Sequence, residues 1–208
     1  GDGVINDLDK TNIGSPLPKF TFGWTNTFRY KNFDLSIFIN GSYGNKVFNY
    51  LDMKLSAMNN VWVNTSNSVK GHANLAPINP DKVYDNGGRW YDDVSNVQVT
   101  NPNASIPRPT RNDPNDNDAI SDRYVEDGSY IRLKNITLGY TFPKKMVEKV
   151  GLQSLRLSVN VQNLLTITGY DGYDPEIGAS TASENVYGLD FGRYPSPTVY
   201  SFNLNVSF

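Results

Sequence analysis

Five aromatic residues in two polar regions of the chain are the first candidates for chemistry. Trp62, Trp90 and Tyr91 lie in one long region rich in Asn, Asp, Pro and Gly, and Tyr170 and Tyr173 lie in a second. Flat rings among amide and carboxylate groups suit the binding of sugars or peptides, because rings bury large areas while amides supply directional hydrogen bonds. The sequence therefore predicts a substrate-binding surface. The alternative is that these rings only hold the loops in shape or face a protein partner.

The first nine residues carry oxygen donors at a spacing that a calcium site would use. Residues 1–9 resemble the second half of an EF-hand loop, with Gly3 at the sharp turn. The donors would be the side chains of Asp2, Asn6 and Asp9 and the carbonyl of Val4. Asp9 stands where a bidentate Glu is usual, and the first ligands of such a loop would precede Gly1. Ca²⁺ is therefore a hypothesis for a cofactor, and an Asx-rich turn without metal is the alternative.

The sequence contains no recognisable catalytic arrangement. His72 is the only histidine, so a Ser-His-Asp triad could use no other, and no nucleophile-elbow pattern accompanies it. The absence of cysteine excludes a disulfide framework, a Cys-ligated metal site and a thiol nucleophile. We therefore expect a protein that is not an enzyme.

The composition limits which secondary-structure elements could carry these residues, and which partners the protein could have. The 208 residues include 19 Lys+Arg and 21 Asp+Glu, and a net charge of -2 gives no reason to expect a nucleic-acid partner. No apolar run approaches the roughly 20 residues of a membrane helix. The strands of a transmembrane barrel, however, alternate and average out as polar. An aromatic content of 12%, mostly Tyr and Phe, favours such strands.

Alternation of apolar and polar residues predicts five strands. The first two, 20–30 and 33–43, would form a hairpin with a two-residue link in which Asn32 is able to take a positive φ. The others are predicted at 124–142, 155–162 and 200–208, with a helical turn at 143–151 before the fourth. In the third strand the apolar parity slips between Leu133 and Ile136, which predicts a β-bulge near Lys134. Arg29 and Arg156 fall on the polar parity, where pairing with carboxylates is expected.

The connections between these strands differ sharply in length at the two ends. Short links at 31–32 and 143–151 alternate with long loops at 44–122 and 169–197, and residues 47–58 of the first loop have helical spacing. Transmembrane barrels have short periplasmic turns, long extracellular loops and outward-facing apolar residues. Five strands cannot close such a barrel, and lipid tolerates no open edge, so we expect part of a larger protein.

The predicted fold is all-β, with about five C-terminal antiparallel strands of a large transmembrane β-barrel. Residues 1–19 would be a loop, 20–43 a hairpin, and 44–122 a long extracellular loop that contains a short helix. Residues 123–208 would hold the C-terminal strands, with a second extracellular loop at 169–197. The alternative is a soluble, surface-exposed β-rich module that binds glycans.

Several segments resemble the SusC/RagA-type TonB-dependent outer-membrane transporters. The longest is residues 127–140, DGSYIRLKNITLGY. Shorter matching segments lie at 1–7, 13–16, 18–20, 31–36, 101–104, 107–108, 162–166, 172–176 and 194–197. Together they are spread over nearly the whole chain.

The resemblance implies a multi-pass barrel in the outer membrane of a Gram-negative cell that imports glycans or oligopeptides. It implies a SusD-like surface lipoprotein as partner, and TonB, which would act through an N-terminal part that this sequence lacks. The lipid bilayer would surround the strands.

Overall fold

The structure is a computed structural model that describes residues 7–57, 67–84, 87–104, 106–109, 119–176 and 187–208. The chain divides into two units, residues 1–50 with 122–208, and residues 51–121. None of the helices in the described part of the chain has the length and apolar character needed to cross a membrane.

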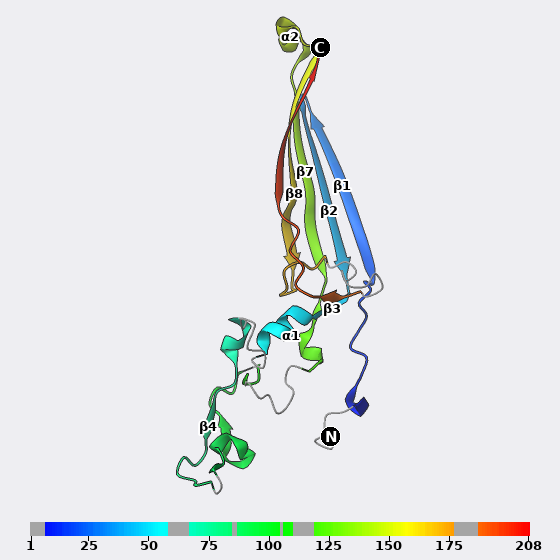
Figure 1. Ribbon diagram of the computed structural model, residues 1–208. Coiled ribbons are helices and arrows are strands. Elements are labelled where there is room, and N and C mark those ends of the chain that lie inside the picture. Colours follow the sequence, from blue (N-terminus) through cyan, green and yellow to red (C-terminus); the bar gives the residue numbers. More distant parts are fainter. Residues whose placement is uncertain (1–6, 58–66, 85–86, 105, 110–118, 177–186) are drawn as a thin grey trace. The chain divides into compact units, whose positions relative to one another are not determined.

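A sheet of five long antiparallel strands makes up most of the first unit. The strands are β1 (Phe20–Tyr30), β2 (Phe33–Tyr43), β7 (Tyr130–Thr141), β8 (Ser154–Thr168) and β10 (Val199–Ser207). Their order in the sheet is β1-β2-β7-β8-β10, which follows the order of the sequence. Figure 1 shows them side by side, with α2 at one end of the sheet and β3 at the other. The predicted antiparallel all-β fold is confirmed.

The strand register places the apolar residues on one face of this sheet. Residues directly opposite each other on antiparallel strands share a face. One row across all five strands joins Phe28, Leu35, Leu138, Val159 and Phe202. Phe202 is 81% exposed and Phe28 is 53% exposed, so no other described residue covers this face.

The buried apolar residues of the described chain come from elsewhere. They are Val47, Met53, Tyr124, Val147 and Tyr170. A soluble β-sandwich would enclose the apolar face of the sheet against a second sheet. Here that face stays bare, which is the arrangement expected of a strand surface in contact with lipid.

A β-bulge interrupts the middle of the sheet at the predicted position. The pairing of β7 with β2 passes from Leu133 to Asn135 while β2 passes directly from Ile39 to Phe38, so Lys134 is the extra residue there. On β8 the same irregularity includes Asn163, which has a φ of 52°. The bulge restores the apolar parity, so that Leu133 and Ile136 lie on the same face.

The short connections lie together at one end of the sheet. In the β1–β2 turn the positive φ of 53° belongs to Lys31, so the prediction that Asn32 takes it is wrong. The pairing of Tyr30 with Phe33 leaves two turn residues, and the first of them makes the sharp reversal. The predicted helical turn is confirmed as α2 (Lys144–Val147) and a 3₁₀ helix (Glu148–Val150), closed by Gly151 at a φ of 78°.

A small sheet lies at the other end of the first unit. It contains β3 (Lys46–Asn49), β6 (Val125–Asp127) and β9 (Leu189–Asp190), in the order β6-β3-β9. The helix expected at 47–58 therefore begins later, as α1 (Tyr50–Ser56), because the backbone of residues 46–49 pairs with two strands.

The strand predicted at 124–142 is split in two. After β6, Ser129 donates from its backbone N–H (2.9 Å) and its hydroxyl (2.5 Å) to Asp127 Oδ1. These hydrogen bonds lower the pKa of the Asp127 carboxyl and fix the turn between β6 and β7. Gly128 is needed here, since a Cβ would lie 2.6 Å from a methyl group of the buried Val47.

The described residues of the second unit include a pair of short antiparallel strands and several 3₁₀ helices. β4 (Leu75–Pro77) pairs with β5 (Val97–Val99), and the 3₁₀ helices span Asn67–Gly71, Trp90–Asp92 and Val94–Asn96. Asp93 accepts from Lys82 and from Ser95, which lowers the pKa of its carboxyl to about 2. Side-chain hydrogen bonds thus help to fix the described part of this segment.

Candidate functional site

The polar face of the five-stranded sheet carries an ion pair near the turn end. Arg156 in β8 donates from Nη2 to Asp34 Oδ2 in β2 at 2.6 Å. The pair reaches across β7 at Gly139, where a Cβ would lie 2.3 Å from the guanidinium nitrogen. The expected pairing of Arg156 with a carboxylate is confirmed.

Short polar side chains line the middle of the same face. Asn160 donates from Nδ2 to Asn135 Oδ1 and to Thr137 Oγ1, both at 2.8 Å, and Thr137 also donates to Asn135 at 3.1 Å. These groups are half-buried hydrogen-bonding side chains, as expected for a face turned toward water and polar solutes.

Arg132 joins the sheet to the chain that follows β8. Its side chain is 3% exposed, and its Nε donates to Thr166 Oγ1 at 2.8 Å. Its two terminal nitrogens pair with Asp174 and, at 2.5 Å, with Glu176. Lys134, the bulge residue, also reaches Glu176 at 2.6 Å. Each nitrogen of the guanidinium therefore has an acceptor, and two carboxylates balance the buried charge.

Asp174 in turn fixes the backbone on both sides of the second loop. Its Oδ1 accepts the N–H of Glu176 and its Oδ2 accepts the N–H of Ser196, both at 2.9 Å. Burial raises the pKa of this carboxyl, but the hydrogen bonds from Arg132 and the two backbone N–H groups outweigh it and hold the pKa below the ordinary value of 3.8. The ionised form is the one that the folded loop favours.

A second buried contact holds the same loop. The Tyr170 hydroxyl donates to Asp190 Oδ2 at 2.6 Å, and Asp190 Oδ1 accepts the N–H of Gly192 at 2.7 Å. Tyr170 is 5% exposed and leaves no ring face free for a ligand. This is the loop-holding role that the sequence offered as the alternative for the aromatic residues.

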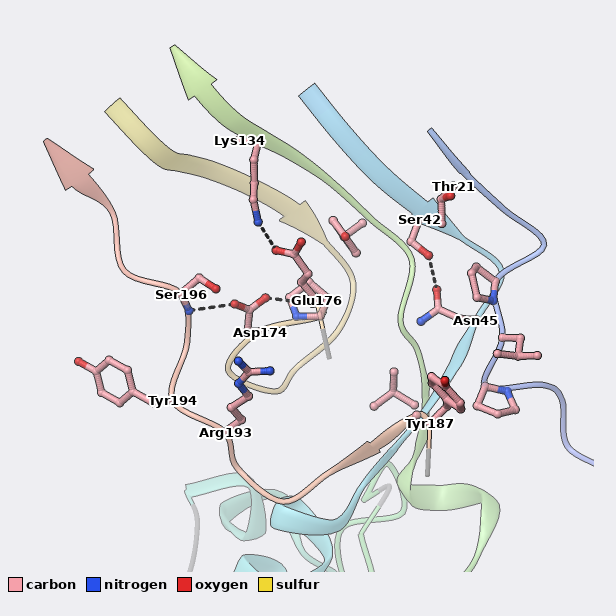
Figure 2. A pocket seen from close by; sticks show the side chains of 17 residues that line it. Thr21, Ser42, Asn45, Lys134, Asp174, Glu176, Tyr187, Arg193, Tyr194 and Ser196 are labelled. Atoms are coloured by element: carbon pink, nitrogen blue, oxygen red, sulfur yellow. Dashed lines mark hydrogen bonds and ion pairs between the residues drawn. The ribbon is translucent and has the colours of Figure 1, made fainter. Parts of the chain in front are cut away.

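Lys134, Asp174 and Glu176 line a pocket of about 560 Å³ on the polar side of the first unit. Figure 2 shows Lys134, Asp174 and Glu176 on one wall and Ser42 with Asn45 on another. Other lining residues include Pro16, Tyr130, Tyr187, Arg193 and Tyr194. Rings, hydroxyls, amides and paired charges around an open volume of this size can bind a polar molecule such as a short peptide or an oligosaccharide.

The structure brings two of the predicted aromatic residues into contact. In the second unit Trp90 and Tyr91 stack edge to face with ring centroids 5.6 Å apart. In the first unit Tyr173 is exposed, while Tyr170 is buried. Trp62 lies outside the described residues. A substrate contact by Trp62, Trp90, Tyr91, Tyr170 or Tyr173 stays a prediction.

The predicted calcium ligands fall mostly outside the described chain. Asp9 is exposed at the end of a 3₁₀ helix (Asp7–Asp9), and Asp7 pairs with Lys10 at 2.6 Å. Asp2, Val4 and Asn6 lie outside the described residues. Among the residues that the structure does describe, no group of three His, Asp or Glu side chains could hold a metal ion.

Sequence reasoning missed the residues that shape the pocket. Arg132 alternates with apolar neighbours and so belongs to the polar face of β7, as Arg29 and Arg156 do on their strands. This alternation could have predicted a charged residue in need of carboxylate partners. Its partners Asp174 and Glu176 lie 42 and 44 residues further along the chain, and no local pattern links them to it.

Known proteins resemble this chain along its whole length. TonB-dependent receptor P3 of Formosa agariphila is 37% identical over 212 residues, covering 100% of this chain and 18% of the relative. TonB-dependent receptor SusC of Bacteroides thetaiotaomicron is 27% identical over 210 residues, covering 100% of this chain and 17% of that protein. The chain thus spans less than a fifth of the length of these relatives. No family model matches it.

Solved structures share the fold. The RagAB peptide importer in its closed-closed state superimposes with a TM-score of 0.68 at 19% identity, covering 99% of this chain and 19% of that one. Its open-open state gives a TM-score of 0.63 over 94% of this chain. Along its whole length the chain is similar to a segment of TonB-dependent receptors, SusC among them, and it shares the fold of the matching part of RagAB.

Proposed function

We propose that this chain is part of the wall of an outer-membrane importer, with the apolar face of the five-stranded sheet in the bilayer and the polar face toward an aqueous interior. The observation that carries the proposal is the bare apolar face opposite hydrogen-bonded polar rows. Strands of 11 or 12 residues, at about 3.3 Å per residue and a tilt near 45°, cover about 25 Å, the thickness of the apolar band of such barrels.

The imported molecules would be glycans or oligopeptides. A pocket that combines tyrosine rings with amide and hydroxyl groups supports a polar solute of this kind. The RagAB structures belong to a peptide importer, which makes peptides a natural first class to test.

The proposed partners follow from the same family. The rest of the barrel would close on β1 and β10, which each pair with one strand of the sheet. A SusD-like lipoprotein would contact the long loops outside, and TonB would act on a part of the importer that this chain does not include. A Ca²⁺ ion at Asp2, Val4, Asn6 and Asp9 is a further, separate hypothesis.

Cell fractionation and uptake test this function. We expect the intact protein in outer membranes, released by detergent and not by buffer, and we expect its deletion to slow the uptake of oligopeptides or oligosaccharides. Release into buffer alone would contradict the proposal and favour the soluble glycan-binding module. Uptake that is unchanged for both substrate classes would contradict the importer role while leaving the membrane location intact.

A further inference from the structure

We propose that the pocket beside Asp174 binds a carboxylate group of the imported solute, and that Arg193 is the residue that binds it. This inference rests on the proposed function, because it names the chemical group that the importer would recognise on its solute. The charges that line the pocket support it, together with the partners that each of them already has.

Two carboxylates line the described part of the pocket, and both are already neutralised. Asp174 pairs with Arg132, and its oxygens also accept the backbone N–H groups of Glu176 and Ser196, both at 2.9 Å. Glu176 Oε2 accepts from Arg132 at 2.5 Å and from Lys134 at 2.6 Å. Two cations therefore balance two carboxylates, and no negative charge remains for a third cation.

Arg193 is that third cation. It lines the pocket and is exposed. In Figure 2 its side chain points from the chain before β10 toward the wall that carries Asp174. Its guanidinium forms no ion pair with any carboxylate that the structure describes. The pocket therefore carries one positive charge that an anionic group of a solute can neutralise.

The backbone that carries Arg193 is held on both sides. On one side the N–H groups of Gly192 and Arg193 donate to Asp190 Oδ1 at 2.7 and 3.3 Å, and Asp190 is buried. On the other side the N–H of Ser196 donates to Asp174. A planar guanidinium on a fixed backbone loses little freedom on binding, and it matches a carboxylate through two parallel N–H···O bonds.

Two exposed rings line the same pocket. Tyr194 is 84% exposed and Tyr187 is 57% exposed. Such rings can pack against the uncharged part of a solute while the guanidinium binds its charged group. An oligopeptide with a free carboxyl end and an oligosaccharide that contains a uronic acid both present this combination. The carboxylate is therefore the shared feature that we expect the pocket to recognise.

Calorimetric binding to the intact importer in detergent tests the proposal with two matched pairs of probes. N-acetyl-pentaalanine with a free carboxyl end is compared with its C-terminal amide, and trigalacturonic acid is compared with its methyl ester. In the solute class that binds, we expect the acid to bind about tenfold more tightly than its neutral counterpart, because only the acid forms a charge-assisted pair with the guanidinium.

Variants of Arg193 should change this preference without changing the fold. Arg193→Gln should reduce it to less than about twofold, whereas Arg193→Lys should keep part of it, because lysine retains the charge but not the two parallel donors. Both variants should unfold at the temperature of the parent, since the side chain is exposed. The matched control is Arg123→Gln, which removes an exposed guanidinium that does not line the pocket and should keep the full preference.

Two results would overturn this inference while leaving the proposed function intact. One is equal binding of the acid and the neutral form by the unaltered importer, and the other is an equal loss of preference in Arg193→Gln and Arg123→Gln. If neither peptide and neither oligosaccharide binds to the intact importer, the proposed function itself is contradicted, and this inference with it.

Discussion

Arg132 is the single side chain on which the start of the second loop most depends. It is 3% exposed, and it pairs with two carboxylates that the chain reaches only after β8 has ended. A buried guanidinium is tolerated because each of its nitrogens has an acceptor. The residue thus links the bulged strand β7 to the wall of the pocket.

Replacing Arg132 with Met should strongly destabilise the protein, by about 3–5 kcal/mol, because Asp174 and Glu176 lose their shared cation. Thermal unfolding in detergent and protease cleavage near residue 174 would measure the effect. Lys10→Met is the control, since the Lys10–Asp7 pair is exposed and should contribute less than about 1 kcal/mol. Similar unfolding temperatures for the two variants would show that the prediction is wrong.

Two glycines of the sheet should differ in their tolerance of a methyl group. A Cβ at Gly41 would lie 2.6 Å from the backbone oxygen of Tyr130, which the sheet holds in place. The atoms nearest to a Cβ at Gly139 would be the ends of Arg156 and Asp34, which can turn away. We expect Gly41→Ala to cost about 1–3 kcal/mol and Gly139→Ala to cost less while separating the ion pair. Unfolding temperatures of the two variants would decide.

At the scale of elements, the second loop should loosen in acid. The pKa of Asp174 is lower in the folded loop than its ordinary value of 3.8, so its stabilising effect is complete above that value and is lost as the pH falls through the folded pKa. At neutral pH the variant Asp174→Asn should unfold at a lower temperature than the parent. Between about pH 2 and about pH 5 its unfolding temperature should change less with pH than that of the parent. If the unfolding temperature of this variant falls with pH as steeply as that of the parent, other carboxylates cause the loss of stability in acid.

The two faces of β2 offer a direct test of which side meets lipid. Ile37 pairs with Ile136 on the apolar face, and its neighbour Ser36 pairs with Thr137 on the polar face. Ile37→Arg should cost about 2–4 kcal/mol if the residue lies near the bilayer midplane. Ser36→Arg is the matched control and should assemble normally. The amount of each variant recovered in outer membranes gives the answer, and equal recovery would contradict the proposed orientation.

The sequence predicted those elements that a two-residue alternation of apolar and polar side chains specifies. Alternation located the strands, and the slip between Leu133 and Ile136 located the bulge at Lys134. It failed where distant segments decide the local structure. The start of α1 depends on the pairing of β3 with β6 and β9, and the pocket depends on contacts of Arg132 with residues more than 40 positions away. In the β1–β2 turn, residue type favoured Asn32 for the positive φ, but the geometry of the chain reversal requires it at Lys31.

At the scale of the whole molecule, the calcium hypothesis can be tested without knowing the transported substrate. If Asp2, Val4, Asn6 and Asp9 bind Ca²⁺, adding about 1 mM of the ion should raise the unfolding temperature of the intact protein, and a chelator should reverse the rise. Asp9→Asn should remove most of this response, whereas the exposed Asp7→Asn should keep it. An unchanged unfolding temperature on calcium addition would favour the metal-free turn.

Within the part of the chain that the structure describes, the outer strands β1 and β10 each pair with one strand of the sheet. The other edge of each strand presents a row of backbone N–H and C=O groups, and one face of the sheet is apolar and exposed. Synthesised by itself in an aqueous cytosol, this 23.2 kDa span should therefore stack onto copies of itself and collect in inclusion bodies. Folded protein for biophysical measurements should instead come from co-expression with the rest of the barrel or from refolding into detergent micelles.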